Sequence, residues 1–220
     1  MASYTSTLGS VSMPVDVLDE ESLLRAIGIL TERDPDLASI VQRYGSPPMW
    51  SRPPGFATLI RIILEQQVSL SSARAAYSRL NEATGGVSPT SFLKLSDTEL
   101  KSVGFSRQKT RYGRQLARCI LDGSIDLEAL EGYNDEEARS RLMAIEGIGR
   151  WSADIYLLMA LRRPDVWPHS DIALIKTVTR IKELKNHPSG EEWDAIGEAW
   201  RPWRSVAARL VWYEYLGGRP

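Results

Sequence analysis

The stretch LMAIEGIGRWSADIYLLMAL, residues 142–161, contains a helical pattern that stops at two glycines and begins again within a few residues. Gly147 and Gly149 lie two positions apart, and a second apolar run follows them directly. Glycine adopts backbone angles that other residues resist, and it lets a neighbouring group approach the main chain closely. The pattern predicts a helical hairpin whose first helix ends near Ile145 and whose second begins near Gly149 or Arg150.

The start of the second helix of this hairpin is a candidate anion site. Its first-turn N–H groups have no partner within the helix, and the helix dipole favours negative charge there. A phosphate is the natural candidate, and such main-chain contacts fix position on a nucleic acid without reading its sequence. A short hairpin with glycine is also common as a plain tight turn. The motif alone leaves a plain hairpin, a phosphate site and the edge of an active site as alternatives.

The composition is that of an ordinary globular protein. The 220 residues are 43% hydrophobic and 25% charged, and the longest strictly apolar stretch is the seven-residue IYLLMAL, too short to span a bilayer. The first basic residue is Arg25, which argues against a secretory signal. The one cysteine, Cys119, excludes an intramolecular disulfide and an iron–sulfur cluster. We expect a reducing intracellular setting, the cytoplasm or nucleoid of a prokaryote or the nucleus of a eukaryote, and no membrane partner.

The charge is close to balanced overall but uneven locally. The net charge of −1 argues mildly against a general polyanion binder. Residues 101–121, however, carry six basic residues and no acidic one: Lys101, Arg107, Lys109, Arg111, Arg114 and Arg118. This basic segment is equally consistent with a solvated helix face and with a surface for nucleic acid.

The chain is a succession of helical patterns with no convincing strand, so we expect an all-α fold in one or two lobes. Residues 1–16 are rich in Ser and Thr and predict a disordered lead-in. Ser96 with Glu99, and Asn134 with Glu137, have the spacing of a helix N-cap and its reciprocal partner.

The segment PDVWPHSDIALIK, residues 164–176, supplies a candidate carboxylate. Ser170 is a plausible N-cap, which places Asp171 at the first helical position, where the dipole keeps a carboxylate ionised. Asp171 is also consistent with a simple charge-complementary residue in a first turn. His169 fits a surface or capping group, and two histidines in the whole chain argue against a metal–histidine site.

Tryptophan is unusually frequent, with seven against three phenylalanines. Three of them, Trp200, Trp203 and Trp212, lie in EAWRPWRSVAARLVWYEYL, residues 198–216, interleaved with arginines. Most are expected to line the core or a groove. An electron-rich aromatic pocket is also what a flat, electron-poor or cationic base needs for stacking and cation–π attraction.

Together these segments resemble the helix-hairpin-helix DNA glycosylase superfamily, and within it the DNA-3-methyladenine glycosylase II branch of alkylation repair. The resemblance rests on residues 142–161, on Asp171 twenty residues after Trp151, and on three further segments in the same order. These segments are LIRIILEQQVSLSSARAAYSRL (59–80), VGFSRQKTRYGRQLA (103–117) and WRPWRSVAARLVWY (200–213). The resemblance covers about residues 20–216. It implies one glycosylase fold over residues 17–220, with two interleaved helical lobes, a hairpin at about 134–162 and an active-site cleft between the lobes.

The resemblance also implies roles for individual residues. Asp171 matches the catalytic aspartate, and Trp212 matches a base-pocket tryptophan. Trp151, a second pocket residue, stands where bifunctional relatives have the lysine that forms a Schiff base, which implies a monofunctional enzyme without a lyase step. The residues implied to contact DNA are Gly147, Gly149, Arg150, Ser152 and, as the side chain that fills the gap left by the extruded nucleotide, Gln67. The carbonyls of Met143, Ile145 and Ile148 match a site for Na⁺ or K⁺, and no other cofactor is required.

Three departures from the family pattern stand out. Glu146 replaces the usual proline before the first hairpin glycine, and its charge is unfavourable near a phosphate. Ile155 stands where some relatives have an aromatic residue. The extra N-terminal β-rich domain of some bacterial members is not expected, because the helical pattern begins near residue 20.

The implied reaction is hydrolysis of the N-glycosidic bond of an alkylated base, such as 3-methyladenine, in damaged double-stranded DNA by a monomeric enzyme. Asp171 would stabilise the positive charge that develops on the sugar. Because N3- and N7-alkylated purines already carry positive charge, we expect them to be preferred over uracil or thymine. The alternatives are a non-catalytic helix-hairpin-helix DNA-binding module and an interaction scaffold with a solvated basic helix.

Overall fold

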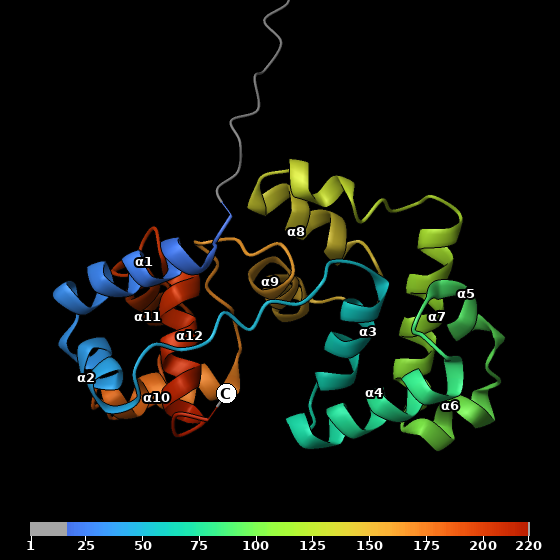
Figure 1. The fold of residues 1–220 in the computed structure, drawn as a ribbon, viewed down its shortest axis with the longest axis horizontal. Helices are drawn as coiled ribbons and strands as arrows, with labels where there is room; N and C mark the ends of the chain where they lie inside the picture. The colour runs from blue at the N-terminus through green and yellow to red at the C-terminus, as the bar shows by residue number, and fades with distance from the viewer. Residues whose placement is uncertain (1–16, 220) are drawn as a thin grey trace, which may run out of the picture.

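The computed structural model describes residues 17–219, and the predicted lead-in at 1–16 lies outside that range (Figure 1). Within residues 17–219 there is no strand, so the all-α prediction is confirmed. The helices of the described chain are α1 (Glu20–Arg33), α2 (Pro35–Tyr44), α3 (Phe56–Glu65), α4 (Leu70–Thr84), α5 (Pro89–Lys94), α6 (Asp97–Val103), α7 (Arg107–Leu121), the 3-10 turn η1 (Ala129–Gly132), α8 (Asp135–Met143), α9 (Arg150–Met159), α10 (Ile172–Ile181), α11 (Gly190–Glu198) and α12 (Arg204–Tyr215). None of the described helices is long and apolar enough to cross a membrane.

Short polar side chains begin most of these helices by accepting hydrogen bonds from first-turn N–H groups. Ser96 and Glu99 form the predicted reciprocal pair at α6. Asn134 caps α8 through the N–H of Glu137. The Glu137 carboxylate does not return to Asn134, however, because it pairs with Arg141 one turn later at 3.0 Å.

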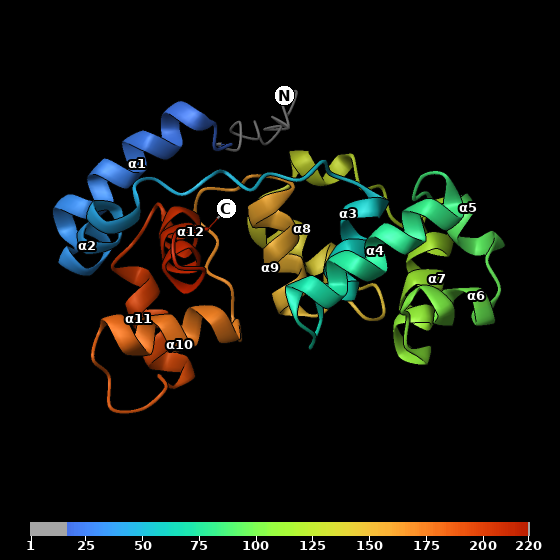
Figure 2. The same cartoon turned by 60° about the horizontal axis from the view of Figure 1, so that its bottom comes forward.

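The helices form two lobes, as Figures 1 and 2 show. The first lobe contains α1, α2, α10, α11 and α12, and the second contains α3 to α9; the close packing pairs, such as α2 with α12 and α3 with α9, stay within one lobe. The chain therefore starts in the first lobe, builds the whole of the second, and returns to the first. Two connectors, residues 45–55 and 160–171, join the lobes.

Each lobe has its own buried side chains, which join into one core. In the first lobe, Trp167 stacks on Trp193 with ring centroids 4.4 Å apart, and Trp200 meets Trp167 edge-on. In the second, Phe92 packs edge-on against Phe56 and Phe105. The unusual tryptophan content is thus partly explained by the first-lobe core rather than by a ligand pocket.

Arg209 on α12 ties the two lobes together. Its guanidinium is fully buried and donates to three carbonyls, those of Met49 (2.8 Å), Leu158 (2.9 Å) and Ser205 (3.0 Å). Met49 belongs to the first connector and Leu158 to α9 in the second lobe. Burial lowers the pKa of Arg209 to about 10, so it remains charged at neutral pH, held by main-chain oxygens.

Candidate active site

Asp171 ends the second connector and caps α10. Its Oδ1 accepts the N–H of Leu174 at 2.9 Å, so Asp171 is itself the N-cap and α10 begins at Ile172. The prediction that Ser170 is the cap and Asp171 the first helical residue is wrong by one position. Ser170 has a left-handed φ of +60°, and this turn brings the Asp171 carboxylate, rather than the Ser170 hydroxyl, to the end of the helix.

Two indole groups complete the surroundings of this carboxylate. Trp151 donates its Nε1–H to Oδ2 of Asp171 at 2.9 Å, and Trp212 donates to Oδ1 at 3.2 Å. Asp171 is only 8% exposed. The structure therefore brings together the three residues that the sequence singled out, Trp151 from the second lobe and the other two from the first. The carboxylate acts as acceptor in all three hydrogen bonds.

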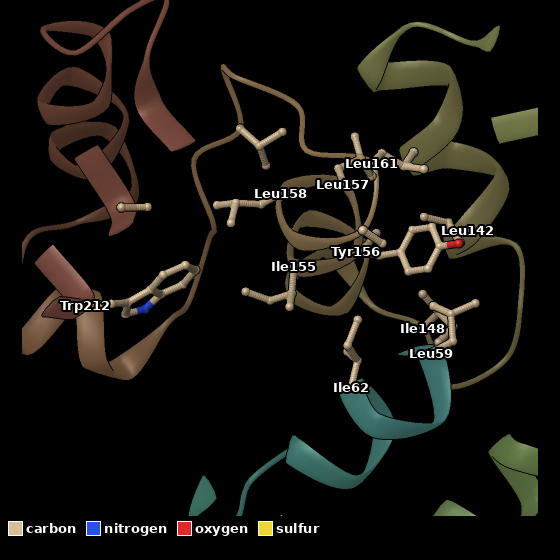
Figure 3. Close-up of a cluster of buried hydrophobic side chains, with 14 of the residues drawn as sticks. Leu59, Ile62, Leu142, Ile148, Ile155, Tyr156, Leu157, Leu158, Leu161 and Trp212 are labelled. Carbon is tan, nitrogen blue, oxygen red and sulfur yellow. The ribbon is translucent and has the colours of Figure 1, made fainter. Parts of the chain in front are cut away.

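The wall beside Trp212 is aliphatic. Figure 3 shows Ile155 and Leu158 extending from α9 toward Trp212 at the junction of the lobes. Ile155 is 3% exposed. The departure noted at this position is therefore a packed aliphatic side chain. Cavities of about 330 and 240 Å³ lie elsewhere in the described chain, beside Arg162 and beside Arg114.

The two hairpin glycines serve different purposes. Gly147 has φ +90°, and a Cβ there would lie 2.1 Å from the ring of Tyr112. Gly149 has an ordinary φ of −86°, and a Cβ there would meet nothing within 4 Å. Packing therefore demands glycine at 147, whereas at 149 the chain simply leaves open space beside the first turn of α9. That turn has no side-chain cap, which leaves its N–H groups available to an anion.

Ser152 and Arg150 occupy different surroundings on the first turn of α9. Ser152 is 2% exposed, and its hydroxyl accepts a hydrogen bond from Gln66 Nε2 at 3.0 Å. A role of Ser152 toward DNA therefore falls on its main chain. The half-exposed Arg150 side chain lies 3.8 Å from Asp154.

Glu146, unexplained by the sequence, pairs with Arg111 of α7 at 2.9 Å. Both side chains are half-exposed. Tyr112, the next residue of α7, lies under Gly147. The basic helix therefore rests against the hairpin, and Arg111 compensates the charge that stands beside the candidate phosphate site.

Gln67 lies at the tip of the turn between α3 and α4. It is exposed and has φ +57°, a backbone conformation that is uncommon outside glycine. The neighbouring Val68 and Leu70 are also exposed. Strained backbone of this kind clusters at functional sites.

The three carbonyls of the candidate cation site fall in the turn of the hairpin. The Ile145 carbonyl accepts the N–H of Ile148 at 3.1 Å, which leaves its second lone pair free. No hydrogen bond ends on the carbonyls of Met143 or Ile148 within residues 17–219. Main-chain oxygens are suitable ligands for a hard monovalent cation, so these residues fit the group.

Sequence reasoning missed four residues that organise the site. Gln66, Lys109, Arg111 and Tyr112 contact the hairpin or the turn before Gln67. Two sequence features mark these four residues. One is the pair of glutamines that ends an apolar helix, and the other is the basic segment, whose contact partners lie far away in the sequence.

An all-α protein of two interleaved lobes, with a helical hairpin beside a buried carboxylate at their junction, has the architecture of a helix-hairpin-helix DNA repair protein. The chain belongs to the HhH-GPD superfamily of base excision DNA repair proteins, whose family model matches residues 60–202. The predicted superfamily is thereby confirmed.

Several similar proteins carry names from alkylation repair. A Bacillus subtilis DNA-3-methyladenine glycosylase is 25% identical, over 91% of this chain and 75% of its own length. Another B. subtilis relative, YfjP, is 28% identical over 80% of this chain, which spans only 64% of that protein. The structure of the Schizosaccharomyces pombe 3-methyladenine DNA glycosylase Mag1 with abasic DNA matches with a TM-score of 0.80 and 25% identity, covering 86% of this chain and 95% of Mag1. These matches support the predicted alkylation-repair branch.

Proposed function

We propose that this protein is a monofunctional DNA glycosylase that removes alkylated purines, 3-methyladenine among them, from double-stranded DNA. The observation that carries the proposal is the buried Asp171 carboxylate, held by two indole N–H groups at the junction of the lobes. Relatives named DNA-3-methyladenine glycosylase support the substrate class. The Mag1 structure contains abasic DNA, which is what remains after a base has been removed.

Base extrusion comes first. The damaged nucleotide rotates out of the helix, at a cost of a few kcal/mol that is lowest for a weakened pair, and Gln67 fills the gap. The base then stacks on Trp151 and Trp212. Because their indole edges face Asp171, their ring faces are the parts left to meet a base. A cationic purine gains cation–π attraction there that a neutral pyrimidine does not.

The glycosidic bond then breaks with its electron pair moving to the purine. An N3- or N7-alkylated purine carries positive charge beforehand and leaves as a neutral base, so it needs little acid assistance. Positive charge develops at C1′ of the sugar, where the Asp171 carboxylate stabilises it. Water adds to C1′ and loses a proton, which yields the abasic sugar.

The hairpin holds the DNA near the lesion. In this proposal the first-turn N–H groups of α9, from Arg150 to Ser152, bind a phosphate, and Gly149 gives it room. A Na⁺ or K⁺ ion on the carbonyls of Met143, Ile145 and Ile148 would add positive charge near that phosphate. We further propose that the protein acts as a monomer, in the nucleoid of a prokaryote or the nucleus of a eukaryote.

The test of catalysis is Asp171→Asn, assayed by single-turnover release of 3-methyladenine from methylated duplex DNA. We expect a loss of about 10²- to 10³-fold, as for removal of one electrostatic transition-state contact, with lesion binding retained. The exposed Asp126→Asn serves as the matched control. Excision by Asp171→Asn at the wild-type rate would disprove the assignment. A wild-type protein that binds DNA but releases no base would identify a non-catalytic DNA-binding module instead.

The monofunctional chemistry has its own test. Trp151 offers no amine to attack the sugar, so borohydride added during turnover should trap no covalent protein–DNA adduct. A bifunctional glycosylase/lyase assayed in parallel supplies the positive control. An adduct with the wild-type protein would overturn the monofunctional proposal while leaving base removal intact.

A further inference from the structure

The first turn of α7 holds the end of α3. Lys109 donates its Nζ to the carbonyls of Leu64 at 2.7 Å and Gln66 at 2.9 Å. The last carbonyls of a helix have no partner within it, and a basic side chain is a known way to satisfy them. Lys109 therefore fixes the backbone at the point where α3 ends and the turn to α4 begins.

Gln66 joins the same point to the hairpin. Its Nε2 donates to the carbonyl of Gly147 at 2.8 Å and to the hydroxyl of Ser152 at 3.0 Å. Both amide hydrogens are thus committed, one to the turn of the hairpin and one to the first turn of α9. Gln66 is partly buried, whereas Gln67 beside it is exposed.

We infer that Gln66 and Lys109 are positioning residues for base extrusion: they fix the turn that presents Gln67 in a set position relative to the phosphate-binding hairpin. The inference rests on the proposed function, because Gln67 acts on DNA only if the protein extrudes a base. It assigns the two adjacent glutamines separate work, Gln66 anchoring the turn and Gln67 entering the stack.

The physical argument is one of preorganisation. Gln67 is held at φ +57°, a conformation that costs free energy and persists only where its surroundings enforce it. Because Lys109 and the hairpin hold Gln66, the turn has its final conformation before it binds DNA. Without these anchors, the free-energy cost of ordering the turn would be added to the cost of extruding the base.

This role predicts a dependence on how firmly the lesion is paired. An anchored turn lowers the cost of removing a base from its stack, and it does nothing to the bond that breaks afterwards. A lesion in a one-nucleotide bulge has no pairing partner, so less work is needed to extrude it. Loss of the anchors should therefore slow excision of a paired lesion more than excision of a bulged one.

The experiment compares Gln66→Leu and Lys109→Met with two controls of the same chemistry, Gln42→Leu and Lys185→Met. Gln42 and Lys185 are both exposed, and both lie outside the basic segment and the hairpin. Single-turnover release of 3-methyladenine is measured from a paired and from a bulged duplex. We expect losses of about tenfold on the paired lesion and under about twofold on the bulged one, with both controls unchanged.

The ratio of the two rates decides the outcome. Both rates come from one preparation, so the ratio is insensitive to loss of folded protein. Equal losses on both substrates, or no loss on either, would overturn the inference. Extrusion is also followed by 2-aminopurine fluorescence beside the lesion in the Asp171→Asn background. If the wild type extrudes bases but releases none, the proposed function fails, and the fluorescence of the anchor variants still tests the positioning role.

Discussion

Trp151 and Trp212 combine two properties within single residues. The indole edge of each donates to Asp171, and in the proposed function the ring faces stack on the base. Phenylalanine could supply the face but not the N–H, and this separates the two contributions experimentally.

Trp212→Phe should slow excision more than it weakens lesion binding. It removes a hydrogen bond to a charged group, worth about 1.5–3 kcal/mol, or about tenfold or more in rate if the bond acts in the transition state. The ring that stacks on the base is kept, so affinity for a duplex with an uncleavable lesion analogue should stay within about twofold of the wild type. Trp203→Phe, whose indole N–H donates to no partner within residues 17–219, is the control. A loss of affinity as large as the loss of rate would count against this division of roles.

The hairpin glycines offer a second residue-scale test. Gly147→Ala puts a methyl group against the Tyr112 ring at a left-handed φ, so we expect a thermal unfolding midpoint lowered by several degrees, for a cost of about 1–3 kcal/mol. Gly149→Ala meets only open space, so it should fold normally and lose affinity for DNA, since its methyl group would occupy the place of the phosphate. Equal DNA affinity for Gly149→Ala and wild type, at matched salt, would show that no phosphate lies there.

Much of the site at this scale is predictable from the sequence, and the exceptions have physical causes. The family spacing identified Asp171, Trp151 and Trp212, which lie together. The cap shifted by one residue because Ser170 adopts a left-handed φ, which local propensity does not favour for serine. Gln66 could not be separated from Gln67, because only the fold shows which amide turns toward the hairpin.

At the scale of elements, α7 links the loops that the proposed function needs. Lys109 holds the end of α3, and Arg111 and Tyr112 contact the hairpin. Some residues of the basic segment, Lys109 and Arg111 among them, therefore contact other parts of the protein. Neither a solvated helix face nor a DNA surface alone describes the segment. The sequence predicted the helix from its periodicity, but its contacts join residues about 35 to 45 positions apart in the chain and follow no local rule.

The pair between Arg111 and Glu146 predicts an effect on DNA affinity. Glu146→Gln removes a negative charge beside the candidate phosphate site, so it should strengthen binding about two- to fivefold at low salt, and the difference should shrink as salt screens the charges. Arg111→Met exposes the Glu146 charge and should weaken binding. Fluorescence anisotropy over a salt series measures both, with the exposed Glu82→Gln on α4 as control. Unchanged affinity at low salt for Glu146→Gln would place the phosphate elsewhere.

For the whole molecule, the decisive feature is that the site is divided between the lobes. Asp171 and Trp212 belong to the first lobe and Trp151 to the second, so the carboxylate has its three donors only while the lobes are docked. The all-α class could be predicted from helical periodicity, and the two lobes from family resemblance. The docking itself depends on buried contacts such as those of Arg209, which no spacing in the sequence reveals.

Arg209→Met should therefore uncouple the lobes. Methionine fills much of the space but donates nothing, which leaves the buried carbonyls of Met49 and Leu158 without their partner. We expect a loss of about 3 kcal/mol in the free energy of unfolding. The lost contacts join α12 to the first connector and to α9. The substitution should therefore destabilise the junction between the lobes more than the core of either lobe.

Urea unfolding followed by two signals tests this directly. Tryptophan fluorescence reports mainly on the first lobe, which holds Trp167, Trp193, Trp200 and Trp212, and far-UV circular dichroism reports on helices of both. The two transitions should coincide in the wild type and in the exposed Arg118→Met control, and separate in Arg209→Met. Excision should fall in urea concentrations below the main transition of the variant, because Trp151 separates from Asp171 before either lobe unfolds. Coincident transitions in Arg209→Met, at lowered stability, would mean that the lobes remain one cooperative unit and that Arg209 supports their cores instead.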